Sequence, residues 1–532
     1  MTGEADFEAS DALGAPEAIA KSPFVVMKFG GTSVSSLESW QTIETLIRSR
    51  LQAGLKPVVV HSALSGISNQ LSQALDEAMH GDPGTVLQTI RDRHLSLAAD
   101  LGIDGPQLVD EALHELEQLV AGVRLVREVS VRVRVRVMAL GELMSTRMGA
   151  AWLRSRGLDV DWQDARELLT SLQRGGSKHS RDYLSATCSH DADPALQQRL
   201  LGTDGVVLTQ GFIARNRSGE TVLLGRGGSD TSAAYMAARL QARRLEIWTD
   251  VPGMFTANPR LVPSARLLAA LRYDEAQELA SAGSSVLHPR CISPLRPHGI
   301  PLFIRSTMAP HIHGTVISPV TGEIEPQVKG ICVRSGITLI SLDSVGMWHE
   351  VGFLARAFAV FSEHGVSVDF VSTSETNVTV SVESADGVLA EDTQDAVISD
   401  LEQLCKVRVI TQCAAVSLVG QKIRTILPRL APALEVFEEE KIHLMSQAAN
   451  DLNLSFVIGA DQSARLATKL HSTIIRKSGG SPAFGPSWEE LFHADAVRTP
   501  VSDAWWVERR EELLELAKRQ HSAYVYDKAS VL

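Results

Sequence analysis

The stretch Phe24-Val-Val-Met-Lys-Phe-Gly-Gly-Thr-Ser33 decides the fold class of this chain of 532 residues. Residues 24–29 are apolar except for Lys28 and predict a buried strand, and the glycine pair that follows predicts a tight turn. Next comes a helical pattern over 37–51, with apolar residues along one face, and then a second strand at 57–60. A strand, a small-residue turn, a helix and a strand in this order are typical of a three-layer αβα domain with a mostly parallel sheet.

A different pattern begins after residues 316–328, where Ser, Pro, Gly and Glu gather and predict a domain boundary. Strands and helices then follow in the order βαββαβ over 337–410, and a similar order returns over 414–473, with its first helix at 427–440. The sequence therefore predicts two small ferredoxin-like units after the α/β domain. The expected divisions are a mobile leader at 1–22, the α/β domain at 23–320, the two units at 329–411 and 412–477, and a tail at 478–532.

The composition argues against several classes of function. Lys and Arg number 51 and Asp and Glu 63, so the net charge is −12, which argues against a general nucleic-acid-binding protein. No run of 18 apolar residues is present, and the first 22 residues are acidic and rich in Ala, so we expect neither a membrane span nor a signal peptide. The five cysteines form no C-x-x-C pair, which favours a reduced, cytoplasmic compartment.

Lys28 and the pair Gly30-Gly31 have the chemistry of a phosphate site. Glycines allow the backbone to approach a ligand closely, and the helix that follows points its free N–H groups at the same space. Lys28, near the end of the strand, adds a full positive charge. Taken alone, such a glycine pair also fits a plain tight turn beside a surface lysine, so other clusters have to decide between the two interpretations.

The second cluster is Gly225-Arg-Gly-Gly-Ser-Asp230. Arg226 stands among glycines that weaken both helix and strand, and its planar guanidinium suits a carboxylate ligand. Ser229 and Asp230 are expected to cap the next helix. A third polar loop, 248–260, follows another predicted strand, whereas a Walker A sequence and the protein-kinase motifs are absent. A phosphate-binding protein with these loops therefore belongs to another class.

The string Lys28-Phe-Gly-Gly-Thr-Ser-Val34 resembles the signature of the aspartokinases, within the amino acid kinase superfamily. The likeness continues in order through Ser62…Asn69, Gly141-Glu142-Leu-Met-Ser145, Gly225…Asp230, Trp248-Thr-Asp250 and Val286-Leu-His-Pro289. Farther on, Met347…Leu354, Ser367-Val-Asp369 and Thr373-Ser-Glu375 are similar to the ACT-domain effector segment of lysine-sensitive aspartokinases. The resemblance covers about residues 24–477. Acetylglutamate kinase, glutamate kinase and UMP kinase share the fold but lack the first motif and the paired ACT units.

The resemblance implies transfer of a phosphoryl group from ATP, with Mg²⁺, to the side-chain carboxylate of L-aspartate. The implied catalytic residues are Lys28 and Asp230, and no residue is predicted to bind a metal ion directly. Aspartate is expected to contact Ser62, Ser68, Glu142, Arg226 and Ser229, and the nucleotide Lys28, Gly30, Gly31, Thr249, Asp250, Phe255 and Arg260. Arg226 would hold the α-carboxylate, Glu142 the α-ammonium, and the Gly30 and Gly31 amides the phosphate oxygens. Because a carboxylate is already an anion at pH 7, this nucleophile needs no general base.

The same resemblance implies feedback inhibition by L-lysine at the first ACT unit and a homodimer formed through the ACT units. The implied effector residues are Met347, Glu350, Gly352, Leu354, Asp369, Ser374 and Glu375. Asp369 is an anion suited to a ligand ammonium, and the start of the helix expected at 353–364 suits a ligand carboxylate. The alternative is that Asp369 only caps the end of a strand and that the domain only dimerises.

Three residues depart from the family pattern. Ser68 stands where Thr is common, Phe255 where Tyr is usual, and Ser285 where the family has a Lys that contacts ATP. Ser285 motivates an alternative function, an amino-acid-sensing protein with a weakened kinase site. A third possibility is a relative that phosphorylates another acid, such as glutamate.

Residues 131–137 alternate Val and Arg, and this period of two predicts a strand. The family instead has a helical region here, and the resemblance overrules the strand. Arg132, Arg134 and Arg136 are expected to form a solvated face.

The tail ends near Ser522-Ala-Tyr-Val-Tyr-Asp527, which resembles the opening strand of diaminopimelate decarboxylases. Before it come Trp505-Trp506 and an amphipathic helix expected at 508–520. The chain thus resembles the kinase half of a bifunctional aspartokinase/diaminopimelate decarboxylase, with the tail as a linker and the start of a second module.

Overall fold

The computed structural model describes residues 14–173, 179–284, 286–319, 326–343, 351–383, 391–426, 441–447, 449–475 and 483–492. The chain forms two compact units, residues 1–485 and 486–532, and every site discussed below lies in the first. Several sequence predictions lie outside the described residues: the leader 1–13, Ser285, Met347, Glu350, and the segments 427–440 and 505–527.

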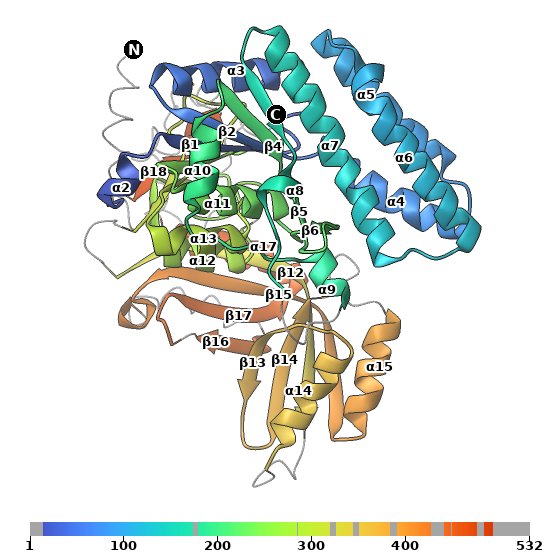
Figure 1. Ribbon diagram of the computed structural model, residues 1–532. Helices are drawn as coiled ribbons and strands as arrows, with labels where there is room; N and C mark the ends of the chain where they lie inside the picture. Colours follow the sequence, from blue (N-terminus) through green and yellow to red (C-terminus); the bar gives the residue numbers. More distant parts are fainter. Residues whose placement is uncertain are drawn as a thin grey trace, which may run out of the picture. The chain divides into compact units, whose positions relative to one another are not determined.

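An eight-stranded sheet forms the centre of the first part of the chain (Figure 1). Its order is β3-β4-β2-β1-β7-β10-β11-β9, and all neighbours run parallel except β10 and β11. The strands are β1 (Phe24–Phe29), β2 (Lys56–His61), β3 (Val160–Gln163), β4 (Val206–Gln210), β7 (Arg244–Thr249), β9 (Ala270–Arg272), β10 (Leu302–Ser306) and β11 (Thr315–Ser318). All six residues of β1 are buried, because helices cover both faces of such a sheet. The predicted fold class is confirmed.

Helices and short strands complete this part. The helices are α3 (Leu37–Gln52), α4 (Ile67–His80), α5 (Gly84–Leu101), α6 (Gly105–Val126), α7 (Val131–Ser155), α8 (Ala165–Leu168), α9 (His179–Leu184), α10 (Pro194–Leu201), α11 (Gly228–Leu240), α12 (Tyr273–Ser281) and α13 (Ile292–Leu295). The short strands are β5 (Ile213–Arg215), β6 (Thr221–Leu223) and β8 (Arg266–Leu268). Strand β18 (Phe484–Ser487) begins at the end of the first unit, and α18 (Trp488–Phe492) belongs to the second unit. Helices α4 to α7 pack on one another (Figure 1). None of the described helices is long and apolar enough to cross a bilayer.

Residues 131–137 are the first turns of α7, so the strand that their alternation predicts is wrong. The Ser130 side chain accepts a hydrogen bond from the Val133 N–H and caps this helix, at 3.3 Å. Val135 and Val137 are buried, so the apolar residues of the segment serve a helix interface. Tertiary packing and a cap therefore override the period of two.

The expected leader is partly built into the fold. Residues 17–20 form the short helix α2 (Glu17–Ala20), and Ile19 is only 2% exposed. A buried apolar side chain fixes this segment, so residues 14–22 are not a mobile leader in the way the acidic composition predicts.

The remaining strands form a six-stranded sheet of order β13-β14-β12-β15-β17-β16. Its elements are β12 (Gln327–Asp343), α14 (Phe353–Glu363), β13 (Val368–Thr373), β14 (Asn377–Glu383), α15 (Glu391–Glu402), β15 (Lys406–Gln421), β16 (Leu444–Gln447), β17 (Asn453–Gly459) and α17 (Ser463–Ile474). The long strands β12 and β15 are antiparallel neighbours along nearly their whole length. The expected division at residues 411 and 412 therefore falls inside β15.

The two predicted units are interleaved rather than consecutive. The first half of β12 pairs with the second half of β15, which pairs with β17, while the second half of β12 pairs with β14. Residues 327–335, predicted as part of a boundary and of the first unit, thus belong to the second unit. The sequence conceals this because β15 resembles two short strands around a break, and only the second half of β12 is predicted as a strand.

Candidate active site

Three adjacent parallel strands, β2, β1 and β7, end at the same edge of the large sheet, where such sheets bind ligands. Lys28, the second-last residue of β1, reaches this edge. Its Nζ lies 2.6 Å from Asp230 Oδ1, and the two side chains are 11% and 13% exposed. Helix α11 carries Asp230 in its first turn and packs on β1. The structure therefore brings together the two predicted catalytic residues.

The glycine pair after β1 forms a close backbone approach. A Cβ atom on Gly31 would lie 2.9 Å from the Ala63 carbonyl oxygen, so only glycine fits there. The Gly30 N–H donates to the Trp248 carbonyl at 3.1 Å. That amide is engaged in the sheet, which corrects the expectation that it is aimed at a phosphate oxygen. A Cβ on Gly30 would lie 3.6 Å from Lys28 Nζ, so the ammonium stands directly over this turn.

Glu142 is a buried carboxyl group beside this turn, 2% exposed on helix α7. Burial raises its pKa to about 8, although the Ala63 N–H donates to it and opposes the rise. Within the described part of the chain, its Oε2 atom has no hydrogen-bond partner. A buried oxygen without a partner is costly, and an ammonium ligand would satisfy it. Because Ala63 touches both Gly31 and Glu142, the phosphate turn and this carboxyl group lie side by side.

The Arg226 loop is built around glycines in the left-handed region. Gly227 has φ +63°, and a Cβ on it would lie 2.2 Å from His288 Cβ, so no other residue fits. Gly227 is itself the N-cap of α11 and no side chain caps the helix. Ser229 and Asp230 stand inside the first turn, so the predicted capping role is wrong. Asp230 is turned toward Lys28 instead.

Arg290, in the short helix η1 (Pro289–Cys291), is a neighbour of the site that the sequence does not reveal, and His288, just before it, is quoted above only as part of the motif 286–289 without a role. The Arg290 guanidinium donates to the Leu224 carbonyl at 2.5 Å and to the Ala186 carbonyl at 3.0 Å. It thereby holds the strand end that leads into Arg226. Burial lowers the pKa of His288, and the neighbouring Arg290 lowers it further. No local signal marks Arg290, since its partners are 66 and 104 residues away in sequence.

Some of the remaining predicted substrate and nucleotide residues lie close to this edge of the sheet, and others lie farther along the loop that follows β7. The Ser62 N–H donates to the Phe29 carbonyl at 3.2 Å, and Ser68 stands in the first turn of α4. Thr249 Oγ1 donates to Asp250 Oδ1 at 3.0 Å, directly after β7. Farther along that loop, Phe255 is 9% exposed and bridges to Leu267, and Arg260 is exposed on a turn closed by Asn258.

Comparisons with known proteins agree with this arrangement. Residues 23–306 match the amino acid kinase family and residues 340–393 an ACT domain. The lysine-sensitive aspartokinase 3 of Escherichia coli (strain K12) is 32% identical over 460 residues, which are 85% of this chain and 99% of that protein. The chain belongs to the aspartokinases. The chloroplastic aspartokinase 3 of Arabidopsis thaliana is also 32% identical, over 84% of this chain and 81% of that protein.

Two crystal structures of the Escherichia coli aspartokinase III are similar to this aspartokinase chain. One, in complex with aspartate and ADP (R-state), has a TM-score of 0.73 at 30% identity. The other, in complex with lysine and aspartate (T-state), has a TM-score of 0.66 at 31% identity. Each alignment covers 85% of this chain and 100% of the other.

The predicted effector residues that the structure describes lie on α14, β13 and the turn after it. Gly352 precedes α14 with φ +91°, and Leu354 is 44% exposed. Ser374 Oγ accepts from the Asn377 N–H at 3.1 Å, and Glu375 is exposed. Asp369 lies inside β13 and pairs with Arg334 at 3.1 Å. Asp369 is the second residue of this strand, and both its effector role and the alternative, that it caps a strand end in a domain that only dimerises, stay predictions.

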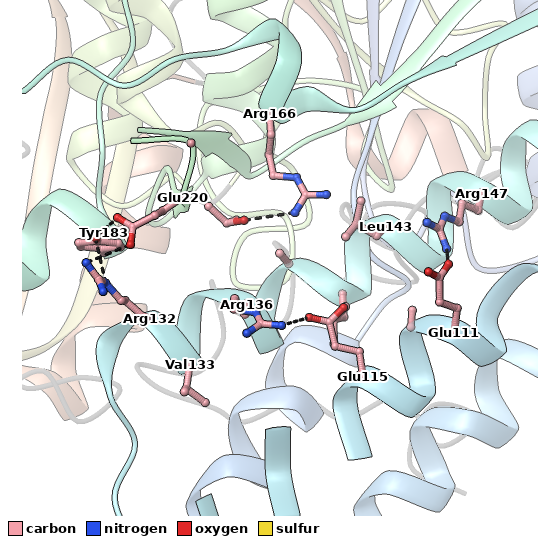
Figure 2. Close-up of a pocket in the computed structure, with 15 residues that line it drawn as sticks. Glu111, Glu115, Arg132, Val133, Arg136, Leu143, Arg147, Arg166, Tyr183 and Glu220 are labelled. Carbon is pink, nitrogen blue, oxygen red and sulfur yellow. Dashed lines mark hydrogen bonds and ion pairs between the residues drawn. The ribbon is translucent and has the colours of Figure 1, made fainter. Parts of the chain in front are cut away.

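A cavity of about 550 Å³ is lined by residues of α6, α7, α8 and α9 and by residues 219–221 (Figure 2). Four guanidiniums surround it, and each has a partner: Arg132 with Glu220 at 3.0 Å, Arg136 with Glu115 at 2.5 Å, Arg147 with Glu111 at 3.1 Å and Arg166 with Thr221 at 3.2 Å. These pairs, together with that of Arg134 with Asp76, agree with the solvated face expected of Arg132, Arg134 and Arg136. The cavity contains none of the predicted site residues.

Proposed function

We propose that this chain transfers the γ-phosphoryl group of ATP to the side-chain carboxylate of L-aspartate, giving 4-phospho-L-aspartate. One observation carries the proposal: the Lys28–Asp230 ion pair stands over a glycine turn that touches the same residue, Ala63, as the buried Glu142 with its unpartnered oxygen. The first feature suits a phosphate and the second suits an ammonium. A substrate that carries an ammonium close to a phosphoryl acceptor fits both.

The proposed chemistry needs positioning and charge neutralisation rather than a general base. The attacking carboxylate is repelled by the triphosphate, and Lys28 reduces this repulsion. An ammonium has three N–H donors, so the pair with Asp230 leaves donors for phosphate oxygens. Glu142 would hold the α-ammonium and Arg226 the α-carboxylate, while Ser62, Ser68 and Ser229 line the aspartate side.

The nucleotide would contact Gly31, Thr249, Asp250, Phe255 and Arg260. Bound Mg²⁺ would supply positive charge to the phosphate oxygens. In the described residues no group of three His, Cys, Asp or Glu side chains could hold a metal ion.

The proposed regulation is feedback inhibition by L-lysine at Asp369, consistent with a first step of lysine, threonine and methionine biosynthesis in the cytoplasm. Five free cysteines support a reducing compartment. Dimerisation through the ACT units is supported by exposed apolar side chains around α14 and β13, namely Val351 at 100%, Leu354 at 44% and Val371 at 42%.

A coupled assay of ADP release with ATP and L-aspartate, with and without L-lysine, tests the proposal. Aspartate-dependent turnover that lysine reduces is the expected result. Lysine binding without turnover would instead favour a sensor with a weakened kinase site, the alternative motivated by Ser285. Turnover with glutamate or acetylglutamate and none with aspartate would assign a different acceptor.

A further inference from the structure

The strand β12 takes part in a different large hydrophobic core in each of its halves, and a smaller cluster around Ile337 and Leu339 lies between them and packs on Phe370. The first half of β12 belongs to the core of the catalytic domain, through Val328 and Ile331. Its second half belongs to another core, in which Ile340 and Leu342 pack with Phe353. A register shift lies between the halves, where Gly336 has φ +74°. A bulge of this kind bends a strand, so it marks a joint between the two cores.

The first half of β12 is firmly attached to the catalytic domain. The Ile331 N–H donates to the Thr256 carbonyl at 2.7 Å, one residue after Phe255 of the proposed nucleotide loop. Lys329 Nζ lies 2.8 Å from Glu275 Oε1 of α12, and both side chains are at least 90% buried. A Cβ on Gly283 would lie 3.2 Å from Arg334 Cβ. Arg334 therefore stands at the joint, on its anchored side.

The Arg334 side chain crosses this joint. Its Nη1 atom lies 3.1 Å from Asp369 Oδ2, and the two side chains are 21% and 29% exposed. The guanidinium also lies 5.3 Å from the ring centroid of Phe370. Asp369 and Phe370 both belong to β13, which pairs with β14 in the other part. One charged contact thus ties the two sides of the joint together through the carboxylate proposed to bind the effector.

We propose that Arg334 occupies the place that the effector ammonium takes at Asp369, so that effector binding and the ion pair across the joint compete with one another. The inference rests on the proposed function, because it takes Asp369 as the carboxylate that binds the ammonium group of the effector. Arg334 and a ligand ammonium would compete for the oxygens of one carboxylate, and the repulsion between the two cations weakens the attraction of each to Asp369. Arg334 is then an internal competitor that sets the effector concentration needed for inhibition.

The change in apparent affinity for the effector depends on the fraction of molecules in which the Arg334–Asp369 ion pair is formed. If the ion pair is closed about 90% of the time, the carboxylate is open to ligand in about a tenth of molecules, and apparent affinity falls about tenfold. Effector binding also removes a tie between β13 and the strand packed against Gly283. The same strand is hydrogen-bonded through Ile331 to Thr256, next to Phe255 of the proposed nucleotide loop, so the competition links effector binding to the nucleotide side of the catalytic domain.

The test measures L-lysine binding to the full chain by isothermal titration calorimetry, without nucleotide. Arg334→Gln removes the competing charge and keeps most of the side-chain length, and Arg334→Met is a second variant with the same charge change. The matched control is Arg408→Gln, which removes another surface guanidinium–carboxylate pair of this sheet, Arg408 with Asp343 at 3.1 Å. We expect both Arg334 variants to bind lysine about tenfold more tightly, and the control to stay within about twofold of the parent.

The outcomes separate this inference from the function on which it rests. If the parent binds lysine and both folded Arg334 variants bind it equally or more weakly, Arg334 is no competitor and the inference is overturned while the effector assignment stands. If the parent binds no lysine at millimolar concentration, the effector assignment itself fails and the inference falls with it. Thermal denaturation of each variant confirms that the folded chain was measured.

Discussion

Lys28 and Asp230 form a nearly buried ion pair, with Nζ and Oδ1 2.6 Å apart. The pair joins the central strand β1 to the first turn of α11, and therefore fixes the ammonium at the one sheet edge where both elements meet. A pair at this burial is held more rigidly than a surface pair, because water screens it little. The cation is thus pre-positioned before any phosphate arrives.

Lys28→Ala should lower kcat by about 100-fold or more, the loss found when a pre-positioned electrostatic group is removed. Lys21→Ala is the matched control, since Lys21 pairs with Glu17 on the surface and is 75% exposed. Coupled ADP-release kinetics and thermal melts of both variants provide the measurement. A folded Lys28→Ala enzyme with near-normal turnover would show that Lys28 has no catalytic role.

The raised pKa of Glu142 predicts a pH dependence of aspartate binding. Below its value of about 8, the carboxyl group of the free enzyme carries a proton, and an α-ammonium ligand requires the ionised form. Binding should therefore release a proton and tighten about tenfold per pH unit up to about pH 8, then level off. Calorimetry in buffers of different ionisation enthalpy counts the proton, and Glu142→Gln should abolish its release. A parent enzyme whose aspartate affinity does not change between pH 6 and 8 would contradict the prediction.

Much of the catalytic domain could be predicted because its information is local. A buried strand followed by two glycines requires only neighbouring residues, and Lys28, Gly31 and Arg226 all lie in such stretches. Arg290 could not be found this way, because its role depends on carbonyl groups distant in sequence. The Gly30 amide was assigned wrongly for the same reason, since its partner, Trp248, comes from another strand.

The interleaved ACT units show a second limit of sequence reasoning. The pattern identifies both halves of β15 and the second half of β12 as strands, but it misses the first half of β12. It also cannot show which half of one strand pairs with which half of the other. Segment 131–137 is a third case, where the alternation of Val and Arg is real and the packing of Val135 and Val137 in a helix decides the structure. Strand pairing and helix packing depend on residues that are distant in sequence, so a local pattern of apolar residues cannot reveal them.

Arg226→Lys should raise the KM for aspartate strongly and that for ATP little, because the charge stays while the planar fork that suits a carboxylate is lost. Arg260→Lys is the reciprocal variant, expected to raise the KM for ATP and leave that for aspartate. Steady-state kinetics with each substrate varied in turn distinguishes the two. The opposite pattern would mean that the two arginines have been assigned to the wrong ligands.

Because His471 is buried, we expect the free energy of unfolding of the chain to fall at acid pH. Burial lowers the pKa of His471 to about 4, and its Nε2 lies 2.8 Å from Thr256 Oγ1. The unfolded chain takes up a proton near pH 6.5 and the folded chain does not, so stability falls as the pH drops from about 6.5 to 4. The slope is about 1.4 kcal/mol per pH unit for one such histidine. His471→Gln should show a shallower decline in denaturant melts over this range, and an unchanged slope would contradict the prediction.

Asp369→Ala should make the enzyme insensitive to L-lysine. The carboxylate is the proposed partner of the ligand ammonium, and within the described residues it is held by Arg334 on the strand that is anchored to the catalytic domain. Loss of this carboxylate removes both the attraction for lysine and the contact with Arg334 that lysine would displace. Lysine then has no difference in affinity for the active and inactive arrangements of the enzyme, so it cannot shift the balance between them. Asp400→Ala is the matched control, because Asp400 pairs with His364 on the same domain and is 45% exposed. Lysine inhibition curves should be flat for Asp369→Ala and unchanged for Asp400→Ala. Inhibition of the Asp369 variant equal to that of the parent would move the effector site to another carboxylate.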